Sequence, residues 1–322
     1  MTAQEYIEST LKSLAEPIQP QDIGTTPLED AIFAKVMSKK FRKWKADEQT
    51  ISVVRDAIKY AVENDQPLQI GQLFGGNKLW RFAEAPEADW AELFGLIYRA
   101  KWAKTITSVY PRGVDFEFYG QDVSVEYLNN LKRSETDRYA ESFKSAIQLV
   151  NSLLPQNLRF TYKRHSEVVD GAAYEAELDA AKEAALAASG GSLPVMGDAE
   201  KKTTELNVRL LPGQDKDPDW REKVELQHGA IFATKSLVPY LANRQSIACS
   251  AAPFPGYLAI GANKRSIAKF WASVGVLEQS SDGYDMLVLS PKQVEAAKFD
   301  WQDVKMAGLM GKNFSKIRVV QG

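Results

Sequence analysis

Residues 114–120 read VDFEFYG, and Val114, Phe116 and Phe118 share one face of this alternating run. Alternation with a period of two, in β-branched and aromatic residues, predicts a β-strand. The segments on either side of this strand decide the class of fold.

The neighbouring segments repeat a pattern of strand and helix. LQIGQLF (68–74) and LRFTYKR (158–164) are candidate strands, and long helical patterns occupy 87–110 and 135–154. Strands separated by helices of this length are typical of right-handed βαβ units, which build a parallel sheet. We therefore expect an α/β fold with a Rossmann-like, open and mostly parallel sheet, in which ligands bind at the carboxyl ends of the strands.

Composition and pattern also divide the chain into four parts. Helical spacing with acidic starts at 27–45 and 47–65 predicts N-terminal helices. An Ala- and Glu-rich run followed by Gly, Ser and Pro predicts an exposed helix and then a flexible linker or a lid. The expected parts are an N-terminal helical segment (1–66), a Rossmann-like core (67–170), the helix with its linker or lid (171–203) and a C-terminal α/β part (204–322).

The C-terminal part alternates again between the two patterns. Strands are predicted at 205–214, 246–261 and 284–290, and short helices at 228–244 and 265–278. This part therefore either extends the first sheet or forms a smaller second lobe.

Charge and cysteine content exclude several classes of protein. Lys and Arg total 40, Asp and Glu total 42, and the net charge of -2 gives no overall attraction to nucleic acid or to an anionic membrane. No apolar run approaches the roughly 20 residues that span a bilayer, and the first residues lack a secretory signal, so we expect a cytoplasmic protein. Cys249 is the only cysteine and His165 and His228 are the only histidines, without HExxH or CxxC spacing. We predict no cofactor, although Mg²⁺ held by carboxylates is not excluded.

The segment FGGNKLWR, which follows the first strand, is a candidate anion site. Gly75 and Gly76 let backbone N–H groups approach a phosphate, and Lys78 and Arg81 add positive charge. The spacing is neither a Walker A motif nor GxGxxG. A plain turn after the strand is the alternative.

Other candidates lie at the ends of strands or the starts of helices. Asp122 follows the strand at 114–120, where it either orients a substrate amine or hydroxyl or forms a turn. His165, in KRHSE, is either an acid or base near neutral pH or part of a surface strand end. Asp89 and Glu92 start a helix, where they stabilise the helix dipole or serve the same crevice.

The C-terminal part adds three candidates. His228 starts HGAIF and is either a partly buried core residue or a general base. Arg209, in the apolar context NVRLL, needs an anionic partner, which is either an internal carboxylate or a ligand. Arg265 precedes a predicted helix and either binds an anion there or lies in solvent.

The order of these features resembles the isocyanide (isonitrile) synthase family. That family has a strand leading to a Phe-x-x-Lys loop, a Pro-Asp-x-x-Glu helix start, a Tyr-x-Pro-Gly turn, a strand ending near Asp, and later Val-Arg-Leu-Ser and Trp-His-Gly segments. The corresponding residues here are Phe74, Lys78, Asp89, Glu92, Tyr110, Gly113, Asp122, Arg209 and His228. This sequence departs from the family pattern at several points. Gly75 and Gly76 widen the spacing before Lys78, and the Ser-Pro-Asn that follows the family's lysine is absent. Arg112 interrupts the Pro-Gly pair, and Gln227 stands where the family has Trp.

The resemblance implies an enzyme that joins an amino acid to ribulose 5-phosphate or a similar anionic carbonyl substrate. Lys78, Arg209 and Arg265 would then hold the anion, Asp122 would orient the amine, and His228 would be the acid or base. The expected partners are small molecules, an amino acid and a phosphorylated sugar, with no nucleic acid and no membrane. A nucleotide-sugar-dependent transferase and a non-catalytic small-molecule-binding protein are the alternatives, and the sequence leaves the oligomeric state open.

Overall fold

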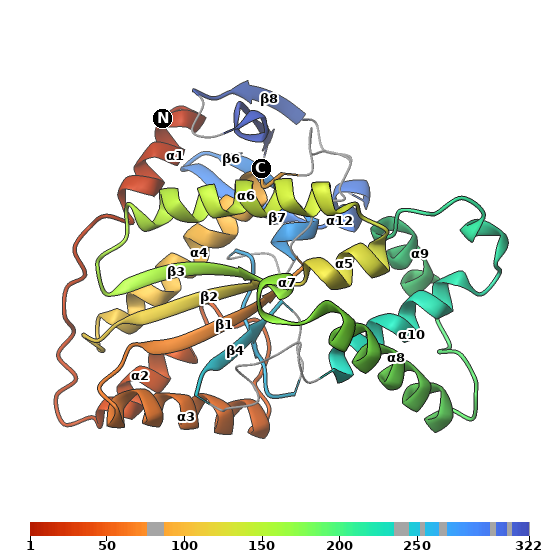
Figure 1. Ribbon diagram of the computed structural model, residues 1–322. Coiled ribbons are helices and arrows are strands. Elements are labelled where there is room, and N and C mark those ends of the chain that lie inside the picture. Colours follow the sequence, from red (N-terminus) through yellow and green to blue (C-terminus); the bar gives the residue numbers. More distant parts are fainter. Residues whose placement is uncertain are drawn as a thin grey trace.

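The computed structural model describes most of the chain and places it in two sheets and surrounding helices (Figure 1). The described residues are 1–75, 87–234, 245–251, 255–263, 269–296, 301–307 and 311–321. The segment FGGNKLWR therefore lies outside them from Gly76 onward, and Lys264 and Arg265 do as well.

The first sheet is an open, five-stranded, all-parallel sheet, which confirms the expected α/β class. Its strands lie in the order β3-β2-β1-β4-β5, so successive strands are added on one side of β1 and then, from β4, on its other side. The strands are β1 (Leu68–Phe74), β2 (Val114–Gly120), β3 (Leu158–Arg164), β4 (Ile247–Ser250) and β5 (Leu258–Ala259). The three strands predicted from alternating runs have the predicted bounds. The predicted strand at 246–261 is instead divided between β4 and β5.

Alternation along β2 separates two hydrophobic clusters. Val114, Phe116 and Phe118 face the main core, where Phe118 packs edge-on against Phe143 with ring centroids 5.4 Å apart. Tyr119 points to the opposite face and joins a second, smaller cluster. The strand therefore has apolar contacts on both faces near its carboxyl end, as the central strands of a parallel sheet usually have.

Helix α4 (Trp90–Thr107) is the centre of the main core. It is buried almost all around, because it contacts strands β2 and β3 of the first sheet on one side and strands of a second sheet on the other. A helix that is apolar on every side belongs in such a position. The helix predicted at 87–110 is therefore present as α4, and it lies between the two sheets.

The second sheet is four-stranded and mixed, in the order β7-β6-β9-β8. Its strands are β6 (Val274–Ser280), β7 (Gly283–Leu289), β8 (Trp301–Lys305) and β9 (Lys316–Gln321). The sequence left open whether the C-terminal part extends the first sheet or forms a second lobe. In the structure β4 and β5 extend the first sheet, and β6 to β9 form a separate sheet. At Gly275, a Cβ atom would lie 2.4 Å from the backbone nitrogen of Ala91, so this close approach to α4 needs glycine.

The remaining helices surround these layers. They are α1 (Ala3–Lys12), α2 (Leu28–Val36), α3 (Glu48–Glu63), α5 (Asp122–Asn129), α6 (Arg133–Asn151), α7 (His165–Val168), α8 (Gly171–Ala188), α9 (Asp198–Asn207), α10 (Trp220–Ala233) and α12 (Pro291–Ala296). Three of them, α8, α9 and α10, form a helical lobe beyond the carboxyl ends of the strands (Figure 1). The described helices include none that is long and apolar enough to cross a membrane.

Two predictions for the C-terminal part were wrong. The segment 205–214 is not a strand, because α9 continues to Asn207 and a loop follows. The segment 265–278 is not a helix within its described residues, because Phe270–Ala272 is a short 3-10 turn and β6 begins at Val274. The predicted helix at 228–244 begins earlier, at Trp220, and its part from 235 onward lies outside the described residues.

Candidate functional site: the carboxyl edge of the parallel sheet

The parallel register brings three residues together at the carboxyl edge of the central strands. Phe74 of β1 pairs with Gly120 of β2, and Gly120 pairs with Arg164 of β3. The next residues along these strands, Gly75, Gln121 and His165, therefore form a row across the edge. In open α/β sheets this edge is where ligands bind.

Two members of this row carry unpaired polar atoms. Gln121 Nε2 and both ring nitrogens of His165 are buried, and within the described part of the chain none of them has a hydrogen-bond partner. Buried polar groups are nearly always hydrogen-bonded, so these exceptions need an explanation. A ligand that bonds to both side chains is one.

His165 is fully buried between aromatic rings. The ring of Tyr174 lies edge-on to it at a centroid distance of 4.3 Å, and the ring of Tyr119 lies 5.9 Å away. Burial lowers the pKa of His165, and the charges of Asp122 and Glu177 oppose this effect without cancelling it. His165 is therefore held as a neutral imidazole, and the alternative of a surface strand end does not describe it.

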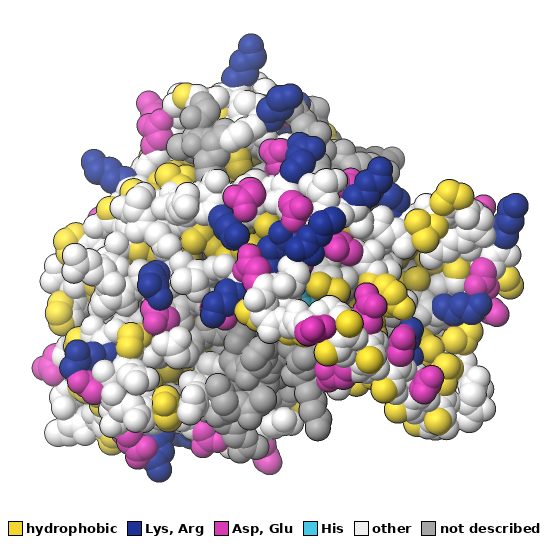
Figure 2. Space-filling view, in the orientation of Figure 1, with side chains coloured by type: hydrophobic (Ala, Val, Ile, Leu, Met, Phe, Trp, Pro, Cys, Tyr) yellow, Lys and Arg dark blue, Asp and Glu magenta, His cyan; other side chains and the backbone are white. Residues whose placement is uncertain are grey.

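Asp122 is the centre of a charged network beside the row. Its carboxylate accepts hydrogen bonds from Arg164 Nε at 2.8 Å, from Ser166 Oγ at 2.5 Å and from Ser166 N at 3.1 Å. Arg133 lies 3.1 Å from the same carboxylate, and Arg164 also donates to Asp137. Figure 2 shows basic and acidic side chains side by side on this face of the molecule. The network ties the end of β2 to the end of β3.

The ionisation of Asp122 follows from these contacts. Burial alone would raise the pKa of its carboxyl group, but the hydrogen bonds from Ser166 and the charges of Arg164 and Arg133 outweigh burial and lower the pKa. The group is therefore a carboxylate at neutral pH. The four contacts described above already engage both carboxylate oxygens of Asp122. Its role in orienting a substrate amine stays a prediction.

His228 lies on α10 beside a carboxylate that the sequence reading overlooked. Its Nδ1 atom is 3.8 Å from Glu225 Oε2, and 43% of its side chain is exposed. The neighbouring His228 lowers the pKa of the Glu225 carboxyl group, and burial opposes this effect. A histidine next to a carboxylate is a common arrangement in general acid and base catalysis. The three-residue spacing of Glu225 and His228 on one helix was the available signal.

Arg209 has an internal carboxylate as its partner. Its guanidinium bonds to both carboxylate oxygens of Glu135, at 2.6 and 2.8 Å, and 44% of its side chain is exposed. The apolar neighbours Leu210 and Leu211 are exposed as well. The segment NVRLL therefore ends in an exposed loop, and of the two alternatives the partner of Arg209 is an internal carboxylate.

Asp89 and Glu92 form a capping box at the start of α4. Asp89 accepts a hydrogen bond from Ala91 N, Glu92 accepts one from Asp89 N at 2.9 Å, and Tyr139 donates its hydroxyl to Glu92 at 3.0 Å. These contacts satisfy the helix start, which is the structural role that the sequence allowed.

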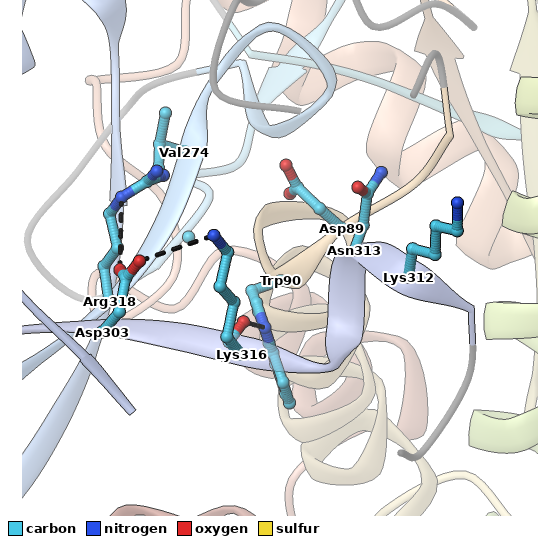
Figure 3. A pocket seen from close by; sticks show the side chains of 9 residues that line it. Asp89, Trp90, Val274, Asp303, Lys312, Asn313, Lys316 and Arg318 are labelled. Carbon is cyan, nitrogen blue, oxygen red and sulfur yellow. Dashed lines mark hydrogen bonds and ion pairs between the residues drawn. The ribbon is translucent and has the colours of Figure 1, made fainter. Parts of the chain in front are cut away.

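A small hollow lies beside this helix start, next to the second sheet (Figure 3). In it Asp303 faces Lys316 and Arg318, and the volume is about 40 Å³. A larger hollow of about 440 Å³ lies on the outer side of α6, near Arg138 and Phe314. Ligand pockets usually measure roughly 300–1,000 Å³, so of these two hollows only the second is large enough. Of the predicted site residues, Asp89 lines the small hollow and none lines the larger one.

Arg99 is a buried cation that the sequence reading also missed. From the core helix α4 it donates to Gln72 Oε1 at 2.9 and 3.1 Å and to the carbonyl oxygens of Gly95 and Gly261. Burial lowers its pKa to about 10, so it remains charged at neutral pH. Gln72 lies two residues before the end of β1, so this charge lies below the carboxyl edge.

Several predicted site residues cannot be placed. Gly76, Lys78, Arg81 and Arg265 lie outside the described residues, while Gly75 is described and buried. Within the described ranges, no group of three or more His, Cys, Asp or Glu side chains could hold a metal ion. The structure thus brings Gly75, Gln121, His165 and Asp122 to one edge. Of the predicted anion-binding residues, Arg209 bonds to Glu135, and Lys78 and Arg265 lie outside the described residues.

The sheet and its polar edge define an open parallel α/β protein. Among solved structures, the chain is similar to the PvcA protein from Pseudomonas aeruginosa, with a TM-score of 0.66 and 14% identity over 91% of this chain and 99% of that one. At this identity the likeness shows the fold alone. No family model and no curated protein sequence matches the chain.

Proposed function

We propose that the protein is a small-molecule biosynthetic enzyme that condenses an amino acid with a phosphorylated sugar, such as ribulose 5-phosphate, or a related anionic carbonyl compound. The observation that carries the proposal is a set of buried nitrogen atoms at the carboxyl edge, Gln121 Nε2 and both ring nitrogens of His165, which lack hydrogen-bond partners among the described residues. The resemblance to isonitrile synthases supplies the substrate classes. The shared α/β fold supports both.

The chemistry assigns a role to each candidate. The amine nitrogen of the amino acid adds to the carbonyl carbon of the sugar, a base takes a proton from that nitrogen, and the former carbonyl oxygen leaves as water after protonation. His228, held by Glu225, is the proposed base and acid. Gln121 and His165 hold polar groups of the substrates, and Lys78 binds the phosphate.

Product analysis tests this proposal directly. The purified protein is incubated with the amino acids singly and with ribulose 5-phosphate or other sugar phosphates, and the mixtures are analysed by mass spectrometry. We expect one amino acid to give a new product that contains carbon from the sugar, and no product with the His228→Asn variant beyond trace amounts. Binding of a sugar phosphate without any product would favour the non-catalytic alternative, and turnover only with nucleotide sugars would favour the transferase.

Lys78→Ala is expected to weaken binding of the phosphorylated substrate about 10- to 100-fold, because a hydrogen bond to a charged group contributes roughly 1.5–3 kcal/mol. The melting temperature should stay within the range of an ordinary surface substitution. Calorimetric titration with the sugar phosphate measures the affinity. Lys59→Ala, which removes an exposed lysine of α3, is the control and should bind normally. Equal affinity of the two variants for the sugar phosphate would favour the alternative, in which FGGNK is a plain turn that binds no anion.

A further inference from the structure

Helix α8 is attached to the rest of the molecule by few side chains. Of its 18 residues, only Tyr174 and Leu178 are buried. Leu178 belongs to the small cluster that contains Leu73 and Tyr119 at the ends of β1 and β2. In Figure 1, α8 crosses in front of α10, which it contacts, and Figure 2 shows its outer face at the surface.

Tyr174 is the contact that covers the carboxyl edge. Its hydroxyl is 2.8 Å from Ser124 Oγ on α5, and Thr234 at the end of α10 also bonds to it. Its ring lies edge-on over His165 at 4.3 Å. Because neither ring nitrogen of His165 has a partner in the described part of the chain, the closed position of α8 keeps a histidine from water and leaves its hydrogen-bonding capacity unused.

We propose that α8 is a lid over the carboxyl edge and that His165 is its proton-sensitive latch, closed when the imidazole is neutral and opened when it is protonated. An imidazolium beneath Tyr174 would be a buried charge with no hydrogen-bonded carboxylate, whereas an opened α8 lets water reach it. The inference concerns regulation of the substrate site, so it rests on the proposed function for its biological meaning.

The charged groups around His165 do not replace the missing partner. Asp122 from α5 is engaged by Arg164 and Ser166, and Glu177 from α8 acts on His165 through its charge alone. On the histidine's own segment, Glu167 bonds to the backbone of Arg164. Tyr119 and Tyr174 contribute neutral rings, and burial raises the pKa of both hydroxyls.

The direction of the pH effect follows from the lowered pKa of His165. The opened form, with a hydrated histidine of pKa near 6.5, binds a proton more readily than the closed form. The closed form is therefore most favoured above about pH 6.5 and becomes less favoured as the pH falls. One proton can change the opening equilibrium by at most about tenfold per pH unit.

Hydrogen exchange of the whole chain without substrate tests the latch. Amide protection factors, corrected for the intrinsic pH dependence of exchange, are measured by mass spectrometry at pH 7.5, 6.5 and 5.5. We expect protection of α8 to fall about tenfold between pH 7.5 and 5.5. Protection of α3, which packs against α2, β1 and β4, should stay constant.

The two histidines of the chain make a matched pair of variants. His165→Phe should give α8 protection that is independent of pH, and His228→Gln should retain the dependence. Constant protection in the unaltered protein, or the same fall in His165→Phe, would overturn the proposal.

A second variant keeps the test decisive if His165→Phe does not fold. Tyr174→Phe removes the hydrogen bonds to Ser124 and Thr234 and leaves His165 in place, so α8 protection should fall at least fivefold at each pH while its pH dependence persists. Unchanged protection in Tyr174→Phe would show that this contact does not hold the lid. None of these measurements uses a substrate. The lid proposal can therefore be overturned without affecting the proposed enzyme function, and the enzyme function can be overturned without affecting the lid proposal.

Discussion

Replacing His228 by Asn is expected to lower the turnover number by about 10²–10⁴-fold, with a much smaller change in substrate affinity. The imidazole is half-exposed on α10, one turn before the buried Ile231, and its Nδ1 atom lies 3.8 Å from Glu225 Oε2. Asn keeps a polar side chain of similar reach but cannot accept and return a proton. Steady-state rates with the amino acid and sugar phosphate that give product measure the effect.

The stability of the same preparation separates catalysis from packing. A partly exposed side chain contributes little to the core, so the melting temperature of His228→Asn should change by only a few degrees. Lys223→Ala is the control, because it removes an exposed cation from the same helix that bonds to Asp217. If His228→Asn is as active as this control, His165 or Asp122 becomes the candidate for the proton transfer.

Replacing Asp122 by Ala is expected to lower the free energy of unfolding by about 3–5 kcal/mol, the usual result of removing one partner of a buried ion pair. Arg164, of which 8% is exposed, would lose its buried acceptor, and Ser166 would lose both its hydrogen bonds to the carboxylate. Urea unfolding at pH 7 measures the loss. Asp137→Ala is the matched control, because Asp137 also bonds to Arg164 but is half-exposed, and such pairs contribute about 0–1 kcal/mol.

Acid unfolding gives a second reading of Asp122. Its pKa is lowered in the folded protein, so its contribution to stability is complete above the unfolded value near 3.9 and is lost as the pH falls through the lowered folded value. Below about pH 4, the stability of the unaltered protein should therefore approach that of Asp122→Ala. Equal stability of Asp122→Ala and Asp137→Ala at pH 7 would show that the buried carboxylate does not hold the two strand ends together.

Local pattern was sufficient for the first half of the fold. The alternating runs at 68–74, 114–120 and 158–164 are strands with those bounds, and the helices between them follow from apolar spacing and acidic starts. The reason is physical: a strand or helix with one consistent apolar face has only one way to bury it. The same reasoning located Asp122 and His165 at the carboxyl edge.

Local sequence pattern was insufficient where contacts with distant segments determine the structure. The segment 265–278 has apolar residues that suit a helix as well as a strand, and pairing with β7 and β9 makes its end β6. Arg209 stands in an apolar context, yet Glu135, 74 positions away in the chain, holds it at the surface. Long-range pairing of this kind has no local signal.

The sequence by itself determined the open parallel sheet, its class of topology and the edge at which polar side chains gather, because the periodicity and order of the elements imply them. Only the tertiary structure decided which side chains meet there. The register of β1, β2 and β3 places Gln121 beside His165, and the packing of α8 covers the imidazole with Tyr174. Those contacts depend on distances between segments far apart in the chain, which no local pattern encodes.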